Sequence, residues 1–218
     1  VVLVDNVSTD KSPKIVKSFL QQNPDFRAVL IREKQKGTGA ASDTGIRYAI
    51  KLGATHIART DAVAMPLYDW IRRIKQHFKD GALIIGGKLK PRTDEAFYTR
   101  RDGVIIPLLI KISERAPRYF HRSPEHKYPM FMIPGLNMAI ESNLYKKAGG
   151  FPRTSIDDTD EDLILHLAVC RLIKPEQAHF AKDMVVYGSI RKVKAFGYIG
   201  ILLWYWDRKI KPKVVDVR

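Results

Sequence analysis

Short apolar runs alternate with amphipathic stretches along most of the chain. Most runs that predict a strand are followed by a segment whose apolar residues recur with helical spacing. The predicted strands are 1–4, 28–31, 56–60, 82–85 and 137–140, and the predicted helices are 12–20, 40–50, 66–78 and 160–173. This alternation is typical of an α/β fold with a largely parallel sheet flanked by helices.

Several element ends carry recognisable signals. Ser12 followed by Pro13 predicts an N-cap and a first helical turn. Gly53 predicts the C-cap of the second helix. Gly86 and Gly87 follow the apolar run 82–85, and we expect them to close that strand.

Residues 94–134 interrupt the alternation. They join an apolar stretch to a basic, aromatic and proline-containing one, without a linker composition on either side. We therefore interpret 94–134 as an insertion or mobile acceptor loop inside a single domain of residues 1–218.

A second unusual segment is the apolar and basic stretch 195–212, which we expect to be a C-terminal helix. Its first twelve residues hold five aromatics and have basic residues on both sides. Twelve residues are too few to span a bilayer, which takes roughly 20. Core packing is one interpretation, and an interfacial helix at a membrane surface is the alternative.

The chain is basic, with 38 Lys and Arg against 23 Asp and Glu and a net charge of +15. Such a field attracts nucleotide phosphates, nucleic acid or an acidic membrane. No zinc-ligand spacing, RNP-like strand or base-reading basic helix supports nucleic-acid binding, so we expect none. The single cysteine, Cys170, excludes an internal disulfide and is compatible with a reducing compartment.

The chain begins inside an apolar run, without Met and without the pattern of a signal peptide. We therefore expect an N-terminal segment to be missing. No apolar run reaches the roughly 18 residues of a membrane span. The expected location is cytoplasmic, with possible peripheral contact at the inner face of the membrane.

Three acidic motifs carry the candidate chemistry. Asp5 follows the strand 1–4 and Asp61 follows the strand 56–60, and ligands of open α/β sheets bind at such carboxyl ends. A carboxylate there accepts hydrogen bonds from a base or ribose, or holds a hard cation. Asn, Ser, Thr and Asp are also common in turns and caps, so a structural role is the alternative for both.

The third motif places five carboxylates in residues 157–162, just before an apolar helix. Carboxylates this close raise one another's pKa unless a cation or basic groups compensate. Asp162 is therefore a candidate general base toward a sugar hydroxyl. A purely structural role at the helix N-terminus is also open for some of the five, because the helix dipole favours acidic residues there.

Taken together, the motifs resemble family 2 inverting glycosyltransferases with the GT-A fold. The resembling segments are VVLVDNVSTD (1–10), KGTGAASDTGIRYAI (36–50), THIARTDAV (55–63), GLNMAIESNLYKKAGGF (135–151) and DTDEDLILHL (158–167). The resemblance implies a Rossmann-like, mostly parallel sheet. It also implies an opening strand, which would lie beside 1–4 and help to form the nucleotide pocket, and which is not found in this chain.

The resemblance also implies site residues. Asp5 would contact the nucleotide base, Asp61 is the first acidic residue of a metal-binding Asp-x-Asp, and Asp162 would be the catalytic base. Gly39 and Asn137 would also lie on the nucleotide and donor side.

On the acceptor side the resemblance implies the turn Gly149, Gly150 and Phe151 together with Glu161. Arg191 could add cationic support near the donor phosphates, and a solvated basic run is the alternative for it.

The implied activity is transfer of a sugar from a nucleoside-diphosphate-sugar, such as a UDP-sugar, to an acceptor hydroxyl with inversion. Acceptors of this type are glycans, lipid-linked molecules or small molecules of cell-envelope, glycolipid or secondary-metabolite synthesis, here expected in a bacterium. Mg²⁺ or Mn²⁺ near Asp61 would offset charge on the leaving diphosphate. Val63 stands at the second acidic position and cannot ligate a metal, so a catalytically impaired nucleotide- or partner-binding relative is the alternative.

Overall fold

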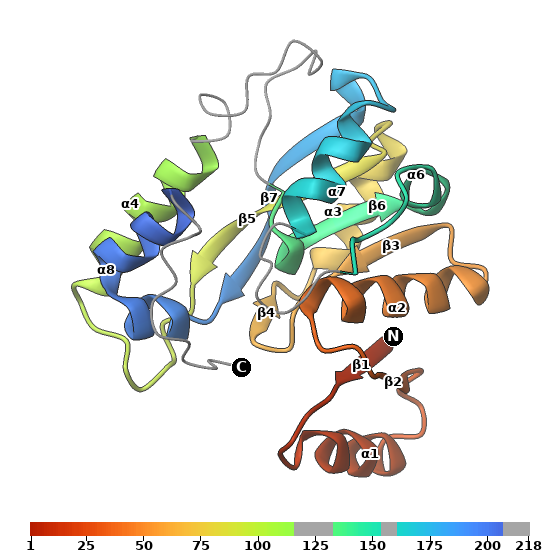
Figure 1. Cartoon of the computed structure of the whole chain (residues 1–218), viewed down its shortest axis with the longest axis horizontal. Helices are drawn as coiled ribbons and strands as arrows, with labels where there is room; N and C mark the ends of the chain where they lie inside the picture. The colour runs from red at the N-terminus through yellow and green to blue at the C-terminus, as the bar shows by residue number, and fades with distance from the viewer. Residues whose placement is uncertain (116–132, 154–160, 207–218) are drawn as a thin grey trace. The chain divides into compact units, whose positions relative to one another are not determined.

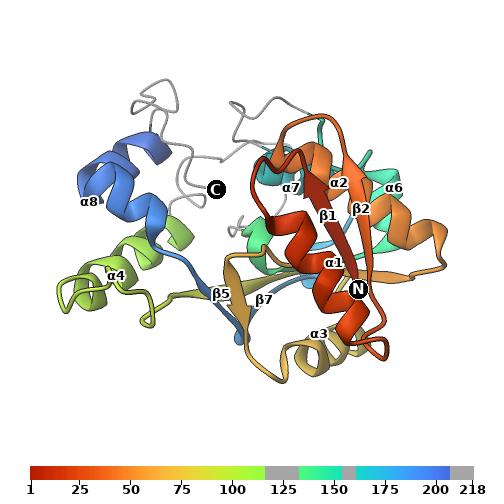
Figure 2. The ribbon, with the colours of Figure 1, turned by 90° about the horizontal axis from the view of Figure 1, so that it is seen from below.

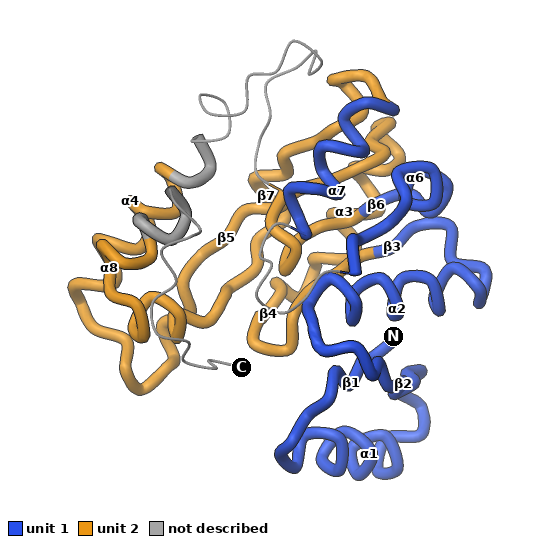
Figure 3. The backbone as a smooth tube through the Cα atoms, in the orientation of Figure 1, with its two compact units in different colours: residues 1–57, 140–172 blue, residues 58–139, 173–218 orange. Residues whose placement is uncertain are grey.

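The structure is a computed structural model of the 218-residue chain, and it describes residues 1–115, 133–153 and 161–206, with side chains to residue 112 in the first range and to residue 201 in the last. These residues form two compact units (Figure 3). Unit 1 comprises Val1–Ile57 and Ile140–Leu172, and unit 2 comprises Ala58–Ala139 and Ile173–Arg218. Organisation as a single domain stays a prediction.

Unit 1 begins with a βαβ arrangement (Figure 1). Strand β1 (Val2–Asn6) pairs in parallel with β2 (Val29–Glu33), so that Asp5 lies beside Arg32 and Asn6 beside Glu33. Helix α1 (Ser12–Gln22) connects the two strands, and α2 (Thr38–Lys51) follows β2. The later part of the unit adds α6 (Ser142–Lys147) and α7 (Glu161–Cys170).

Helix α1 confirms the predicted start and departs from the predicted packing. It begins at Ser12 with Pro13 in its first turn. None of its residues is buried, and Ile15 and Phe19 are 65% and 47% exposed. The helix covers a sheet of only two strands, which is too narrow to bury its whole apolar face.

The end of α2 confirms the signal at Gly53 with a shift of one residue. The C-cap is Leu52, and Gly53 follows with a φ of +90°. Its N–H donates to the Ile50 carbonyl, and the Ala54 N–H donates to the Ala49 carbonyl. A glycine suits this left-handed position because it has no Cβ to clash.

Most of a five-stranded sheet lies in unit 2. Its order is β3-β6-β5-β7-β4, and the strands are β3 (His56–Arg59), β4 (Ala64–Pro66), β5 (Ile84–Pro91), β6 (Met138–Glu141) and β7 (Ala178–Gly188). Strands β5 and β7 are parallel, and β4 is antiparallel to β7. Helix α3 (Trp70–Lys79) packs on β7 and supplies Trp70 and Ile74 to a core with Ile85, Met184 and Val186.

Two predicted boundaries in unit 2 are wrong. The helix expected from Pro66 begins at Trp70, because Pro66 ends β4 and the Leu67 N–H donates to the Val185 carbonyl in continuation of the strand. The strand expected to close at Gly86 and Gly87 runs on to Pro91. Both glycines are paired with β7.

Helices α4 (Asp102–Arg115) and α8 (Arg191–Trp206) lie side by side in unit 2 (Figures 1 and 2). Helix α4 occupies part of the predicted insertion, of which 116–132 lies outside the described residues. The C-terminal helix predicted at 195–212 begins earlier, at Arg191, and is broken at Gly197, whose φ is +70°. Residues 207–212 of that prediction are also outside the description. Among the described helices, none is long and apolar enough to cross a membrane.

Candidate functional site

Asp5 lies at the carboxyl end of β1, as predicted. Its Oδ1 accepts a hydrogen bond from the Ser8 N–H (3.1 Å), and its Oδ2 lies 3.9 Å from Arg32 Nε. The side chain of Asp5 is 11% exposed, whereas that of Arg32 is 69% exposed. The carboxylate is thus fixed in orientation by the loop and remains reachable from solvent.

A cavity of about 320 Å³ opens beside this carboxylate within unit 1. It is lined by Asp5, Ser8, Pro13, Lys17, Leu30, Ile31 and Arg32. Its volume is near the lower end of the range for small-molecule pockets. One carboxylate, two cations and apolar walls suit a ligand with both a ring system and negative charge.

The loop after Asp5 is strained at one residue. Val7 has a φ of +59°, a left-handed conformation that is rare for a β-branched side chain. Such strain costs about 1–3 kcal/mol and is concentrated at functional sites. Its place two residues after Asp5 supports a binding role for this loop.

Asn6 connects the loop to the start of α2. Its Nδ2 donates to the Gln35 carbonyl (2.7 Å), and its Oδ1 accepts from the Gly37 N–H (2.8 Å). Gly39, in the first turn of α2, is buried. A Cβ there would overlap the Pro152 carbonyl oxygen and would lie 3.3 Å from Glu161 Cβ. Gly39 therefore allows close packing of α2 against the chain that leads to α7.

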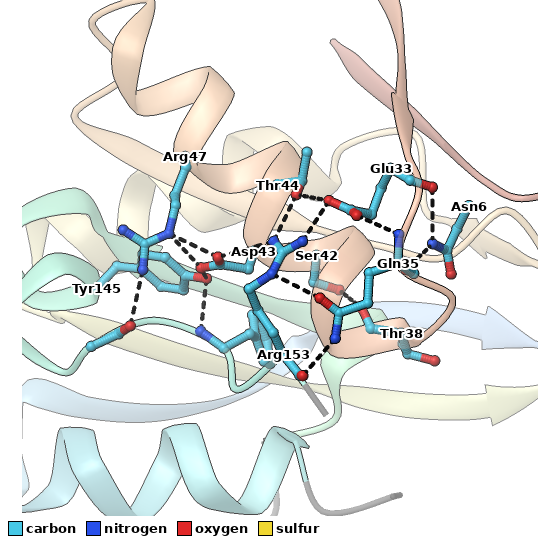
Figure 4. Close-up of polar contacts among 12 residues, drawn as sticks. Asn6, Glu33, Gln35, Thr38, Ser42, Asp43, Thr44, Arg47, Tyr145 and Arg153 are labelled. Carbon is cyan, nitrogen blue, oxygen red and sulfur yellow. Dashed lines mark hydrogen bonds and ion pairs between the residues drawn. The ribbon is translucent and has the colours of Figure 1, made fainter. Parts of the chain in front are cut away.

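Asp43 is a buried ion-pair centre that the sequence analysis missed (Figure 4). Both of its oxygens accept from Arg47 Nε at 2.8 Å, and Oδ1 also accepts from Tyr145 Oη at 2.9 Å. Tyr145 Oη in turn accepts from the Phe151 N–H (2.9 Å), and Arg47 donates to the Gly149 carbonyl (3.0 Å). The predicted acceptor-side turn is thus fixed to α2.

The glycines of that turn have specific conformations. Gly149 and Gly150 have φ values of +86° and +82°. A Cβ at Gly150 would lie 2.7 Å from Asp43 Oδ1. Phe151 is 2% exposed and packs against the ring of Tyr145. Burial raises the pKa of Tyr145, and the Asp43 carboxylate raises it further, so the hydroxyl remains a donor over the physiological range.

A second ion pair lies next to the first. Glu33, at the end of β2, accepts from the Thr44 hydroxyl and from Arg153 Nη2 (2.8 Å). These bonds, together with the Gln35 N–H, lower the pKa of Glu33 from 4.5 to about 2. Arg153 Nη1 also lies 3.6 Å from Asp43. Arg153 therefore links β2, α2 and the chain beyond the acceptor-side turn, as Figure 4 shows.

Glu161 and Asp162 form the first turn of α7. Glu161 is buried at 9% exposure and adjoins Gly39, whereas Asp162 is partly exposed. The other three carboxylates of the acidic cluster, at 157, 158 and 160, lie outside the described residues. Asp5, Gly39, Glu161, Asp162 and the turn 149–151 all belong to unit 1, and their joint action at one site stays a prediction.

Asp61, Asn137 and Arg191 belong to unit 2. Asp61 lies 3.4 Å from Arg59 Nη2 and is 37% exposed, with Val63 two residues on. Among the described residues, no group of three or more His, Cys, Asp or Glu is placed to hold a metal. The Asp61 carboxylate could contribute to the shell of a Mg²⁺-like ion, with donor phosphates and waters among the other ligands.

Asn137 is buried among hydrogen-bonding partners that the sequence around it did not predict. It is fully buried, and its Oδ1 accepts from Trp70 Nε1 (2.9 Å). Its Nδ2 donates to the carbonyls of Lys88 (3.0 Å) and Met184 (2.9 Å). A Cβ at Gly87 would overlap this amide. The contacts hold the strands of unit 2 together, and direct binding of a donor by Asn137 stays a prediction.

Arg191 opens α8, where an unpredicted carboxylate caps the helix. Glu95 accepts from the Ser189 hydroxyl (2.5 Å) and from the Ile190 N–H (2.9 Å). Arg191 Nε donates to the Ser189 hydroxyl (3.2 Å). Arg191 is thus oriented at the N-terminus of α8, and its contact with donor phosphates stays a prediction.

Comparison with known proteins decides the family. A model of glycosyl transferase family 2 matches residues 1–149. The chain belongs to this family. The match includes Asp5, Asp61 and Gly149, which is predicted to lie on the acceptor side, and it ends before Asp162. A comparison with curated proteins gives no match.

Solved glycosyltransferases share the fold of this family 2 chain. The mannosyltransferase PcManGT from Pyrobaculum calidifontis, in complex with GDP-Man and Mn²⁺, aligns over 98% of this chain and 56% of its own, with a TM-score of 0.60 and 20% identity. TarS of S. aureus in complex with UDP aligns over 93% and 55%, with a TM-score of 0.53 and 12% identity. These likenesses confirm the GT-A fold, and the chain spans just over half the length of either structure.

Proposed function

We propose that this chain moves a sugar from a nucleoside-diphosphate-sugar to an acceptor hydroxyl with inversion at the anomeric carbon. The observation that carries the proposal is the set of contacts in unit 1 from the Asp5 loop, through Asn6 and the start of α2, to the first turn of α7. These contacts connect the loop beside the Asp5 cavity to the helix that carries the candidate base Asp162, and this connection supports the proposal. Family membership and structural neighbours in complex with GDP-Man or UDP support the substrate class.

In this proposal each carboxylate has its own task. Asp5 accepts hydrogen bonds from the base or ribose of the donor, while Lys17 and Arg32 add positive charge at the same cavity. Asp162 takes the proton from the acceptor hydroxyl, which attacks the anomeric carbon opposite the departing nucleoside diphosphate. The fixed turn 149–151 shapes the acceptor side. The acceptor belongs to cell-envelope glycan, glycolipid or secondary-metabolite synthesis on the cytoplasmic side of the membrane.

A divalent cation at Asp61 would supply positive charge to the leaving diphosphate. Because Val63 stands where the second acidic ligand would be, we expect the cation to bind together with the donor rather than before it. Titration with Mn²⁺ alone should give no saturable binding, and titration in the presence of GDP or UDP should give binding. Tight Mn²⁺ binding without a nucleotide contradicts this arrangement.

Product analysis with an Asp162→Asn variant tests the reaction. We expect loss of transfer by a factor of about 10²–10⁴, the usual contribution of a general base, with nucleotide binding unchanged. Asp25→Asn, at an exposed aspartate between α1 and β2, is the matched control and should retain activity. The anomeric configuration of the product, read by NMR, should be the opposite of the donor's. Retention of configuration, or full activity without Asp162, refutes the proposed roles.

A second function is favoured by the composition of the Asp61 motif. Val63 cannot ligate a metal, and Asp61 is paired with Arg59. Both features suit a relative that binds a nucleotide or a partner without transfer. Val63→Asp separates the two functions. A large gain in cation-dependent transfer supports the impaired relative, whereas unchanged activity supports a native site that works with one carboxylate.

A further inference from the structure

One side of α4 presents an apolar stripe to solvent. Val104, Leu108 and Ile112 are 73%, 56% and 48% exposed, and their spacing of four residues places them on one side of the helix. Asp102 and Ile106, on the opposite side, are 0% and 3% exposed. The helix therefore buries one side and exposes an equally apolar one.

Helix α8 is fixed beside α4 through Asp102. The carboxylate accepts from Lys194 Nζ and from Tyr198 Oη, both at 2.6 Å. Burial alone would raise the pKa of Asp102, but bonds from Lys194, Thr99 and Tyr198 hold it below its ordinary value. Next to Tyr198, Ile199 is 73% exposed. We call the exposed residues of these two neighbouring helices the α4/α8 face.

The exposed charged residues described on the α4/α8 face are cations. Arg100 and Arg101 just before α4, Lys111 within α4 and Lys192 within α8 are all exposed. The one acidic residue in 100–112 and 191–201 is Asp102, which is buried. Within these two ranges of described side chains, the α4/α8 face therefore exposes apolar groups and cations.

We propose that the α4/α8 face binds the surface of a membrane that contains anionic lipids. Apolar side chains flanked by Lys and Arg are what an interfacial helix needs, because the apolar groups enter the acyl boundary while the cations meet lipid phosphates. A second copy of the chain is a poor occupant, since a symmetric contact would set the same cations against one another. The proposal is independent of sugar transfer, and its test uses no donor.

Vesicle co-sedimentation of the whole protein tests the proposal. Binding to vesicles of phosphatidylcholine with phosphatidylglycerol should exceed binding to phosphatidylcholine alone, and it should fall at about 1 M salt, where screening acts within about 3 Å. Leu108→Glu should weaken the binding about tenfold, because it removes an apolar side chain that the membrane would bury and adds a charge that anionic lipids repel. Lys111→Glu should weaken it about fivefold or more, since each cation near such a surface contributes about 1 kcal/mol.

Matched controls keep the test specific. Ile15→Glu changes an apolar residue of α1 that is 65% exposed, and Lys182→Glu changes an exposed lysine of β7. Both should leave vesicle binding unchanged. Circular dichroism spectra should show that all four variants are folded. Equal losses in control and test variants, no preference for anionic vesicles, or a self-association that Leu108→Glu abolishes without any vesicle binding would each overturn the proposal.

Discussion

Replacement of Asp43 by Ala is the most informative change to the framework of the candidate site. The carboxylate is 3% exposed, and it bonds to Arg47 and Tyr145 while it also pairs with Arg153. The change removes all of these contacts at once. Because Tyr145 and Arg47 hold the turn 149–151, the variant tests both the stability and the geometry of the acceptor side.

The magnitude follows from the exposure of each partner. The bond from Tyr145 to Asp43 is buried, and a hydrogen bond to a charged group contributes about 1.5–3 kcal/mol. The side chains of Arg47 and Arg153 are 55% and 41% exposed, so water screens both pairs and each contributes at most about 1 kcal/mol. We therefore expect Asp43→Ala to lower the free energy of unfolding by about 2–4 kcal/mol.

Urea denaturation followed by circular dichroism measures this free energy. A double-mutant cycle with Tyr145→Phe isolates the buried bond. Tyr145→Phe alone should cost about 1–3 kcal/mol, because it also removes the acceptor of the Phe151 N–H. The double variant should lose less than the sum of the two single losses by at least about 1 kcal/mol. Additive losses, or a loss below about 1 kcal/mol for Asp43→Ala, would refute the reasoning.

Three further changes probe other parts of the molecule. Gly39→Ala should destabilise the protein by about 1–3 kcal/mol in thermal or urea denaturation, because its Cβ meets the Pro152 carbonyl; an unchanged stability contradicts this close packing. Because the pKa of Glu33 is lowered in the folded protein, its contribution to the free energy of unfolding is complete above pH 4.5 and disappears as the pH falls toward about 2. The free energy of unfolding of Glu33→Gln, measured at a series of acidic pH values, should therefore depend less on pH than that of the wild type. Identical pH profiles would contradict the assignment. Asp102→Asn should cost about 3 kcal/mol because it leaves Lys194 without its buried carboxylate, whereas a change below about 1 kcal/mol would mean that α4 and α8 do not depend on this bond.

The fold class and the position of Asp5 at the end of a strand could be predicted from the sequence because their signals are local. The apolar run 1–4 followed by Asp5 predicts a buried strand and a polar turn. The structure confirms a strand with Asp5 near its end, but the strand is only partly buried and Val1 is exposed. Strand β7 was missed for a local reason too. Its polar residues Lys182 and Asp183 interrupt the apolar pattern, and residues 182–184 fall in the register shift against β5.

The ion-pair network was missed because its cause is distant in the chain. A charged residue within a helical pattern is usually solvent-exposed. Asp43 is buried because Tyr145, 102 residues away, packs against it. The spacing of Asp43 and Arg47 by four residues was the available signal, and it indicates an ion pair without indicating burial. Asn137 is similar, since Trp70 and two strand carbonyls determine its role.

Calorimetric titration of the protein with GDP, UDP and their sugar conjugates, with and without Mn²⁺, tests the central claim most directly. Our account predicts saturable binding of at least one of these nucleotides, stronger with Mn²⁺. It also predicts that Asp5→Ala weakens this binding about tenfold or more, because a hydrogen bond to a charged group is lost. Absence of binding by every nucleotide, or binding that is unaffected by Asp5→Ala, would contradict it.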